Sequence, residues 1–96
     1  MQKIAIIIPC YNEEKRLEEN KVSQLLSLCD IDIYFANDGS EDNTISLLNE
    51  IKNKQQNIKI LDFKKNEGKA NTIYKSVKLL LEKKYDYIGY LDADFA

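Results

Sequence analysis

The chain has 96 residues, enough for one domain with a single modest hydrophobic core. Hydrophobic residues make up 44% and charged residues 31%, a composition typical of a folded globular protein rather than a disordered one. The formal net charge of −2 leaves no positive surplus for a phosphate backbone, so we expect no nucleic-acid partner. No apolar run approaches the ~20 residues that span a bilayer, and the first residues do not resemble a signal peptide, so we expect a cytoplasmic chain without a membrane segment.

Four short β-prone segments alternate with three helical patterns. The predicted strands are residues 4–8, 31–36, 58–62 and 87–91, and the predicted helices are residues 14–29, 43–54 and 69–84. Asp42 is predicted to cap the second helix. The third helix has the most regular period, and its predicted buried face consists of Ala70, Ile73, Tyr74, Val77, Leu80 and Leu81.

The order βαβαβαβ, with short connections, predicts right-handed crossovers and a mostly parallel sheet covered by helices. The predicted fold class is therefore α/β, a Rossmann-like three-layer sandwich with the strands in the order third, second, first, fourth. No linker or repeat interrupts the pattern, so residues 1–96 form one domain or part of one.

The residue types present restrict the chemistry of any active site. The chain has no histidine and only two cysteines, Cys10 and Cys29. This excludes catalytic dyads and triads built on histidine and most zinc sites, so acid, base and metal work falls to carboxylates. The two cysteines are predicted at opposite edges of the sheet, too far apart for a disulfide, and we expect two reduced thiols.

Four polar clusters follow the four predicted strands, at residues 9–13, 37–40, 65–69 and 92–94. In an open parallel sheet, ligands bind outside the carboxyl ends of the strands, so these clusters point to one binding edge. The second and third clusters also have a plain structural explanation, as a turn and as a loop leading into a helix. The fourth is harder to explain in this way, because two neighbouring carboxylates repel each other unless a cation lies between them.

The side chains of these clusters suit a nucleoside diphosphate and a divalent metal ion. Asp92 and Asp94 can converge on Mg²⁺ or Mn²⁺, which keeps open positions for diphosphate oxygens. Tyr11 offers a ring on which a base can stack. Asp38 and Glu13 can accept hydrogen bonds from a base or a ribose.

Two basic residues near this edge, Lys69 and Arg16, have different predicted roles. Lys69 starts the third helix, near its positive dipole end, and can meet phosphate there. Arg16 is predicted to be solvated surface. The residues alone therefore predict a nucleotide site in which Lys69 takes part and Arg16 does not.

The four clusters together resemble the motifs of family 2 glycosyltransferases of the GT-A fold. Residues 7–13 (IIPCYNE) resemble the opening strand and loop of that family, and residues 37–44 (NDGSEDNT) resemble its DDGSxDxT segment. Residues 66–70 (NEGKA) are similar to its NxGKA segment, and residues 92–94 (DAD) to its DxD metal motif. The resemblance covers essentially the whole chain, and the ordered set is specific although no single motif is.

The resemblance implies an inverting, metal-dependent transferase that takes a sugar from a UDP- or GDP-sugar. It implies a donor site lined by the matching positions of this chain, which are Pro9, Tyr11, Glu13, Ala36, Asp38, Lys69, Asp92, Ala93 and Asp94. Of these, Asp92 and Asp94 would hold Mg²⁺ or Mn²⁺, and Ala36 and Asp38 would form the wall opposite Tyr11.

The acceptor stays open at this stage. The DAD sequence followed by Phe95 and Ala96 is most similar to the branch of the family that glycosylates polyprenyl or dolichyl phosphate. Branches that build polysaccharide carry similar motifs. A lipid-phosphate acceptor would place the complete protein at the inner face of the membrane.

The sequence departs from the family pattern in two respects. Asn37 stands where the family usually has an aspartate, so one charge is expected to be missing beside the nucleoside wall. The chain also stops directly after the DxD motif, so we expect it to be the nucleotide-sugar-binding part of a longer protein, with no catalytic base and little activity alone. A fourth strand at the sheet edge would then be exposed, which favours self-association.

Two alternatives come from other classes of protein. The chain can be an inert nucleotide-binding module, because acceptor recognition is expected downstream. Another Rossmann-like enzyme is disfavoured, since no G-x-G-x-x-G follows the first strand and no G-x-x-x-x-G-K-[ST] is present.

Overall fold

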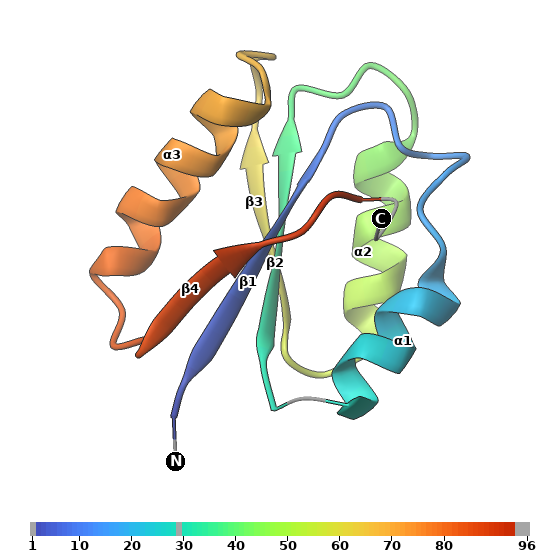
Figure 1. The fold of residues 1–96 in the computed structure, drawn as a ribbon. Helices are drawn as coiled ribbons and strands as arrows, with labels where there is room; N and C mark the ends of the chain where they lie inside the picture. The colour runs from blue at the N-terminus through green and yellow to red at the C-terminus, as the bar shows by residue number, and fades with distance from the viewer. Residues whose placement is uncertain (1, 29, 94–96) are drawn as a thin grey trace.

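The computed structural model describes residues 2–28 and 30–93 of the chain. Within them, strands and helices alternate as β1 (Ile4–Cys10), α1 (Glu19–Leu28), β2 (Asp32–Asp38), α2 (Thr44–Lys54), β3 (Ile58–Phe63), α3 (Lys69–Leu81) and β4 (Tyr87–Tyr90) (Figure 1). None of these helices is long and apolar enough to cross a membrane in the part of the chain that is described.

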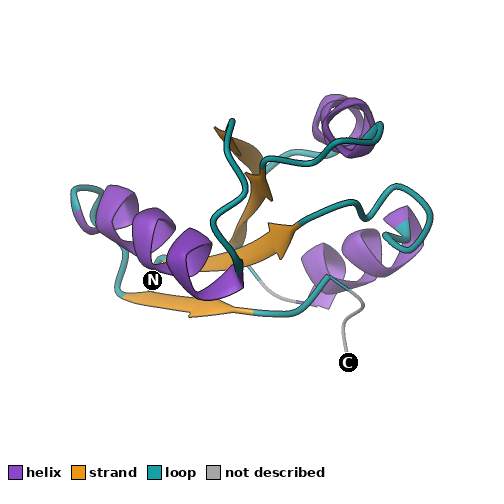
Figure 2. Ribbon diagram, turned by 90° about the horizontal axis from the view of Figure 1, so that it is seen from above, coloured by secondary structure: helices purple, strands orange, loops and turns teal. Residues whose placement is uncertain are grey.

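The four strands form one parallel sheet in the order β3-β2-β1-β4, as the sequence predicts. Helix α3 covers one face of the sheet, and α1 and α2 cover the other (Figure 2). The three-layer α/β architecture is therefore confirmed. Strand β1 lies between β2 and β4 and is buried on both faces, which is why it reads as an almost continuous apolar run.

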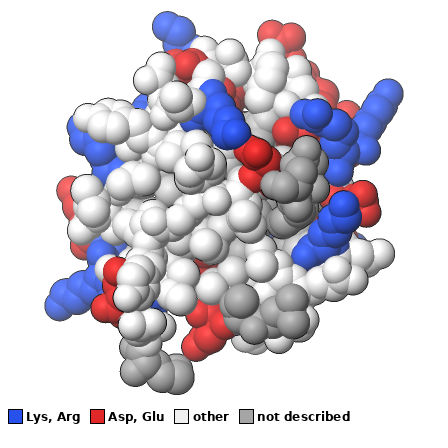
Figure 3. Space-filling view, viewed as in Figure 1, with Lys and Arg blue, Asp and Glu red and all other residues white. Residues whose placement is uncertain are grey.

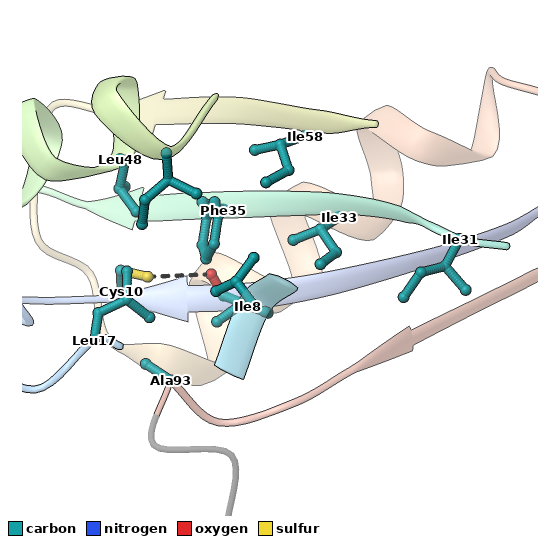
Figure 4. Packing of buried hydrophobic residues seen from close by; sticks show 11 residues of the cluster. Ile8, Cys10, Leu17, Ile31, Ile33, Phe35, Leu48, Ile58 and Ala93 are labelled. Carbon is teal, nitrogen blue, oxygen red and sulfur yellow. Dashed lines mark hydrogen bonds between the residues drawn. The ribbon is translucent and has the colours of Figure 1, made fainter. Parts of the chain in front are cut away.

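The larger part of the core lies between the sheet and helices α1 and α2. Phe35 at the centre of β2 packs there with Ile8 of β1 and Leu48 of α2, and all three side chains are fully buried (Figure 4). Ala93, directly after the β4 segment, packs against the same cluster. The core therefore extends to the carboxyl edge of the sheet.

A second cluster lies under α3 and contains a tyrosine pair, of which Tyr34 is buried and Tyr85 is partly buried. The Tyr34 and Tyr85 rings meet edge to face with centroids 6.0 Å apart, and their hydroxyl oxygens are 2.8 Å from each other. The Tyr85 hydroxyl also donates to Asp32 Oδ2 at 2.5 Å. Desolvation, followed by this hydrogen bond to a carboxylate, raises the pKa of Tyr85 well above its usual value, so the hydroxyl stays protonated.

The first two helices begin later than predicted. Helix α1 starts at Glu19 rather than at residue 14, because the carbonyl of Glu13 closes a separate turn by accepting the backbone N–H groups of Arg16 and Leu17. The N-cap of α2 is Asn43 rather than Asp42. The Asp42 carboxylate accepts the N–H of Thr44, at 2.9 Å, from one position before the observed N-cap.

Helix α3 is also shorter than predicted, and it presents a different face to the sheet. It ends at Leu81, and its buried residues are Thr72, Ser76 and Leu80. Tyr74 and Leu81, predicted to be buried, are 62% and 69% exposed. Periodicity shows which residues share a face but not which way the helix is turned. At the contact the Ser76 hydroxyl donates to the carbonyl of Thr72, whereas the buried Thr72 hydroxyl has no hydrogen-bond partner among the described residues.

Strand β4 forms the open edge of the sheet within the described residues. Its outer residues Tyr87 and Tyr90 are each 56% exposed, and the surface over β4 and α3 carries few charged side chains (Figure 3). The edge has neither proline nor lysine to protect it. Self-association through this edge therefore stays a prediction.

Two neighbouring leucines of α3 test how this helix is turned. Leu80→Ala should lower the free energy of unfolding by about 2–5 kcal/mol, because the buried side chain leaves a cavity. Leu81→Ala, in the same helix, should change it by less than about 0.5 kcal/mol. Urea denaturation followed by circular dichroism measures both, and similar losses for the two variants would show that the helix is turned as the sequence pattern predicts.

Candidate functional site

A cavity of about 270 Å³ opens at the carboxyl edge of the sheet, beside the N-terminus of α3. Seven of the predicted site residues line it, together with two that were not predicted to take part, Cys10 and Arg16. The predicted residues in the lining are Pro9, Tyr11, Glu13, Asp38, Lys69, Asp92 and Ala93.

Two predicted site residues do not enter this description. Ala36 is fully buried in the cluster under α3 and does not line the cavity, so the structure does not place it in the wall opposite Tyr11. Asp94, the second predicted metal ligand, lies outside the described residues.

The loop after β1 is held by the loop after β2. Asn12 takes a left-handed backbone conformation, with φ of 52°, and its side-chain Oδ1 accepts the N–H of Glu41 at 2.9 Å. The backbone N–H groups of Asn12 and Glu13 donate to the hydroxyls of Ser40 and Thr44, at 3.0 and 2.8 Å. These bonds fix the backbone around Tyr11, whose ring stays 40% exposed and can accept a stacked base.

Glu13 and Arg16 form an ion pair in the cavity lining. Their Oε1 and Nη2 atoms are 2.5 Å apart, and the side chains are 12% and 67% exposed, respectively. Arg16 is thus exposed as predicted, yet it also belongs to the site. No pattern in the sequence indicates this contact directly, because it depends on the turn that replaces the predicted start of the first helix.

The Asp38 carboxylate ends β2 and is buried, with only 3% of the residue exposed. Its Oδ1 accepts the N–H of Glu67 at 2.9 Å, and its Oδ2 accepts the N–H of Gly68 at 2.9 Å and the side-chain amide of Asn66 at 3.0 Å. Both oxygens that were expected to face a base therefore already have donors from the protein.

Asn37 lies on the opposite side of β2 from Asp38, because successive side chains of a strand alternate. It is buried, donates to Asp62 Oδ1 at 2.9 Å and accepts the hydroxyl of Ser40 at 2.5 Å. The bond from Lys64, followed by that from Asn37, lowers the pKa of Asp62. Asn37 thus links the ends of β2 and β3. It does not line the cavity, so the replacement of the family's aspartate by Asn37 removes no charge from the cavity wall.

Asp92 is the predicted metal ligand that the structure places in the cavity lining. This carboxylate is about half exposed, and its Oδ1 pairs with Nζ of Lys69. Residues 2–28 and 30–93 contain no group of three acidic, cysteine or histidine side chains able to hold a metal ion. Even so, Asp92 suits Mg²⁺ or Mn²⁺, because it is an oxygen ligand at the cavity wall that already attracts a cation.

Cys10 lines the cavity but is not suited to nucleophilic chemistry. Its thiol is buried and donates weakly to the carbonyl of Ile8, with sulfur and oxygen 3.5 Å apart (Figure 4). Burial, reinforced by the charge of Glu13, raises its pKa well above the usual range. Cys10 is free, as predicted, and Cys29 lies outside the described residues.

A parallel sheet with a polar cavity at its carboxyl edge is a Rossmann-like architecture. Its likeness to solved glycosyltransferases identifies the fold as GT-A. Residues 5–96 match the family described as Glycosyl transferase family 2. The chain therefore belongs to this family, as the motifs predict.

Curated relatives are similar to the chain over most of its length. An uncharacterized protein of Methanocaldococcus jannaschii is 41% identical over 91 residues, which cover 93% of this chain and 39% of the relative. A poly-beta-1,6-N-acetyl-D-glucosamine synthase of Staphylococcus epidermidis is 35% identical over 96 residues, which cover 98% of this chain and 22% of the synthase. The chain thus spans between about a fifth and two fifths of these two relatives.

Solved structures support the fold. The mannosyltransferase PcManGT of Pyrobaculum calidifontis, in complex with GDP-Man and Mn²⁺, superposes with a TM-score of 0.77 at 19% identity, covering 95% of this chain and 27% of that enzyme. Staphylococcus aureus TarS residues 1–349, in complex with UDP, gives 0.74 at 22% identity, covering 97% and 28%. At such identities the likeness establishes the fold alone.

Two glycines beside the cavity allow the packing of its loops to be tested. Gly39 has φ of +61°, and a Cβ built there would lie 2.4 Å from the backbone nitrogen of Asn66. Gly68 has φ of +94° but open space around it. Gly68→Ala should cost about 1–3 kcal/mol of unfolding free energy from backbone strain, and Gly39→Ala should cost more because a rigid backbone must also move.

Urea denaturation of both alanine variants measures the difference. Equal losses would contradict the close approach of the loops that follow β2 and β3.

Proposed function

We propose that the chain is the donor- and metal-binding part of a glycosyltransferase that uses a nucleoside diphosphate sugar. The observation that carries this proposal is the cavity, which collects polar side chains from the loops after β1 and β4, from the last residue of β2 and from the start of α3. Membership of the family and the likeness to enzymes solved with GDP-Man and with UDP support it.

The residues in the cavity divide into a nucleoside end and a diphosphate end. Tyr11, next to Pro9, stacks on the base, and Glu13 accepts a hydrogen bond from the base or the ribose. Lys69 and Asp92, which form an ion pair in the lining, make up the proposed diphosphate end, where Lys69 meets the phosphates.

Asp92 and Asp94 would hold the metal ion, with Ala93 packed beside them. When bound, Mg²⁺ or Mn²⁺ would supply Lewis-acid stabilisation of the charge on the leaving diphosphate. Asp92 lies two residues after β4, and Lys69 neutralises part of its charge. Transfer would invert the anomeric carbon, as the resemblance implies.

Two acceptor classes follow from the proposal. A polyprenyl phosphate is already anionic and needs little help from a base, whereas a sugar hydroxyl needs a carboxylate to deprotonate it. Similarity of the motifs favours the first, and the polysaccharide synthase among the relatives favours the second. The first would place the complete protein at the inner face of the membrane.

Metal-dependent nucleotide binding tests the donor site. Calorimetric titration should show UDP or GDP binding that requires Mn²⁺ and weakens at least about tenfold in Asp92→Ala and in Asp94→Ala, because a ligand of the metal is lost. Asp86→Ala removes an exposed carboxylate that bonds the N–H of Lys3 at the opposite edge, and should leave binding unchanged. Tight binding of NAD that does not depend on metal would overturn the proposal.

Catalysis is a separate question, since the chain spans only part of its relatives. We expect the 96-residue chain to bind the donor nucleotide without transferring sugar, and a longer protein that contains it to do both. Release of free diphosphate from donor sugar, with and without candidate acceptors, measures this. Turnover by the short chain would show that it carries its own catalytic base, and turnover by neither would favour an inert binding module.

A further inference from the structure

Both oxygens of the Asp38 carboxylate accept hydrogen bonds from within the protein, which a direct contact with a nucleotide would not require. It accepts three hydrogen bonds from residues 66–68, and it lies almost entirely out of solvent. A carboxylate has about four acceptor positions, so most of its capacity is already taken before any ligand arrives. Its bonds all go to one short loop, the loop that leads into α3.

This loop is held to the end of β2 at several points. The side-chain amide of Asn66 also donates to the backbone carbonyl of Asp38, at 3.0 Å. The backbone of Gly39 approaches Asn66 so closely that a Cβ would lie 2.4 Å from its nitrogen. Gly68, whose N–H donates to Asp38, is the N-cap of α3. Asp38 therefore fixes where α3 begins.

The position of α3 determines the position of Lys69, because Lys69 is its first residue. Lys69 pairs with Asp92 at the end of β4 and lies with its ammonium 5.8 Å from the centre of the Tyr90 ring. A connected series of contacts thus runs from the carboxylate of Asp38, through residues 66–68, to the diphosphate end of the cavity.

We propose that Asp38 is a positioning residue for the diphosphate and metal end of the donor site, acting through the loop 66–68 and Lys69. This rests on the proposed function, and it goes further by assigning to Asp38 an effect at the end of the cavity opposite the nucleoside. The competing role is a contact with the base alone, which predicts an effect on nucleosides and none on pyrophosphate.

Manganese pyrophosphate, which has no base, separates the two roles. Its affinity for the 96-residue chain is measured by calorimetry in the wild type, Asp38→Asn and Asn66→Ala. Asn66 does not line the cavity, so its effect reports on loop position. Asp62→Asn is the matched control. Asp62 also lies near the end of a strand and accepts a hydrogen bond from Asn37, but it has no hydrogen bond to residues 66–68.

We expect Asp38→Asn to weaken manganese pyrophosphate at least about tenfold, because its amide N–H₂ cannot accept the loop's donors. Asn66→Ala should weaken it in the same direction, and the double variant should lose less than the product of the two effects. Asp62→Asn should bind as the wild type does. Unchanged pyrophosphate affinity in Asp38→Asn, with weaker UDP or GDP, would overturn the proposal.

Amide hydrogen exchange, followed by NMR, tests the same role without any ligand. In Asp38→Asn the N–H groups of Glu67 and Gly68 should exchange faster by at least about tenfold, while amides of β1 and α2 keep their protection. Unchanged exchange at Glu67 and Gly68 would overturn the proposal. If the wild type binds no nucleotide diphosphate, the proposed function fails, and this measurement alone decides whether Asp38 holds the loop.

Discussion

Parallel pairing of β1 with both β2 and β4 is the constraint on which the site depends. It places the carboxyl ends of the strands at one edge, so that loops far apart in the sequence surround the same space. The pairing is maintained by side chains buried on both faces of the central strand. Every polar residue of the cavity lies at the end of a strand, in the segment that follows β1 or β4, or at the start of α3, which follows β3.

The strand order and the edge of the sheet at which the cavity opens were predictable from sequence because they depend on patterns that packing rarely overrides. Alternating strands and helices with short connections allow few topologies, and polar clusters after apolar runs mark the binding edge. Seven of the nine predicted site residues line the cavity, and all seven lie in such clusters. The pattern shows neither how a helix is turned nor what each carboxylate binds.

The differences from prediction have specific physical causes. Helix α3 turns its hydroxyl residues Thr72 and Ser76 to the sheet and leaves Tyr74 exposed, which periodicity alone does not decide. Arg16 reaches the cavity because the carbonyl of Glu13 closes a turn before α1. Ala36 lies on the same face of β2 as Asp38 but two residues further from the carboxyl end of the strand, and its side chain is therefore buried in the core under α3.

The position of the first strand has a consequence for how the chain is made. β1 is synthesised before the other strands of this sheet, yet it lies between two partners, and its pairing with β4 joins Ile4 to Tyr87. One edge of an apolar strand therefore lacks its neighbour until β4 has also left the ribosome. Nascent chains that stall before β4 would carry β1 as the exposed edge strand of their sheet, where chaperones or other nascent copies can pair with it.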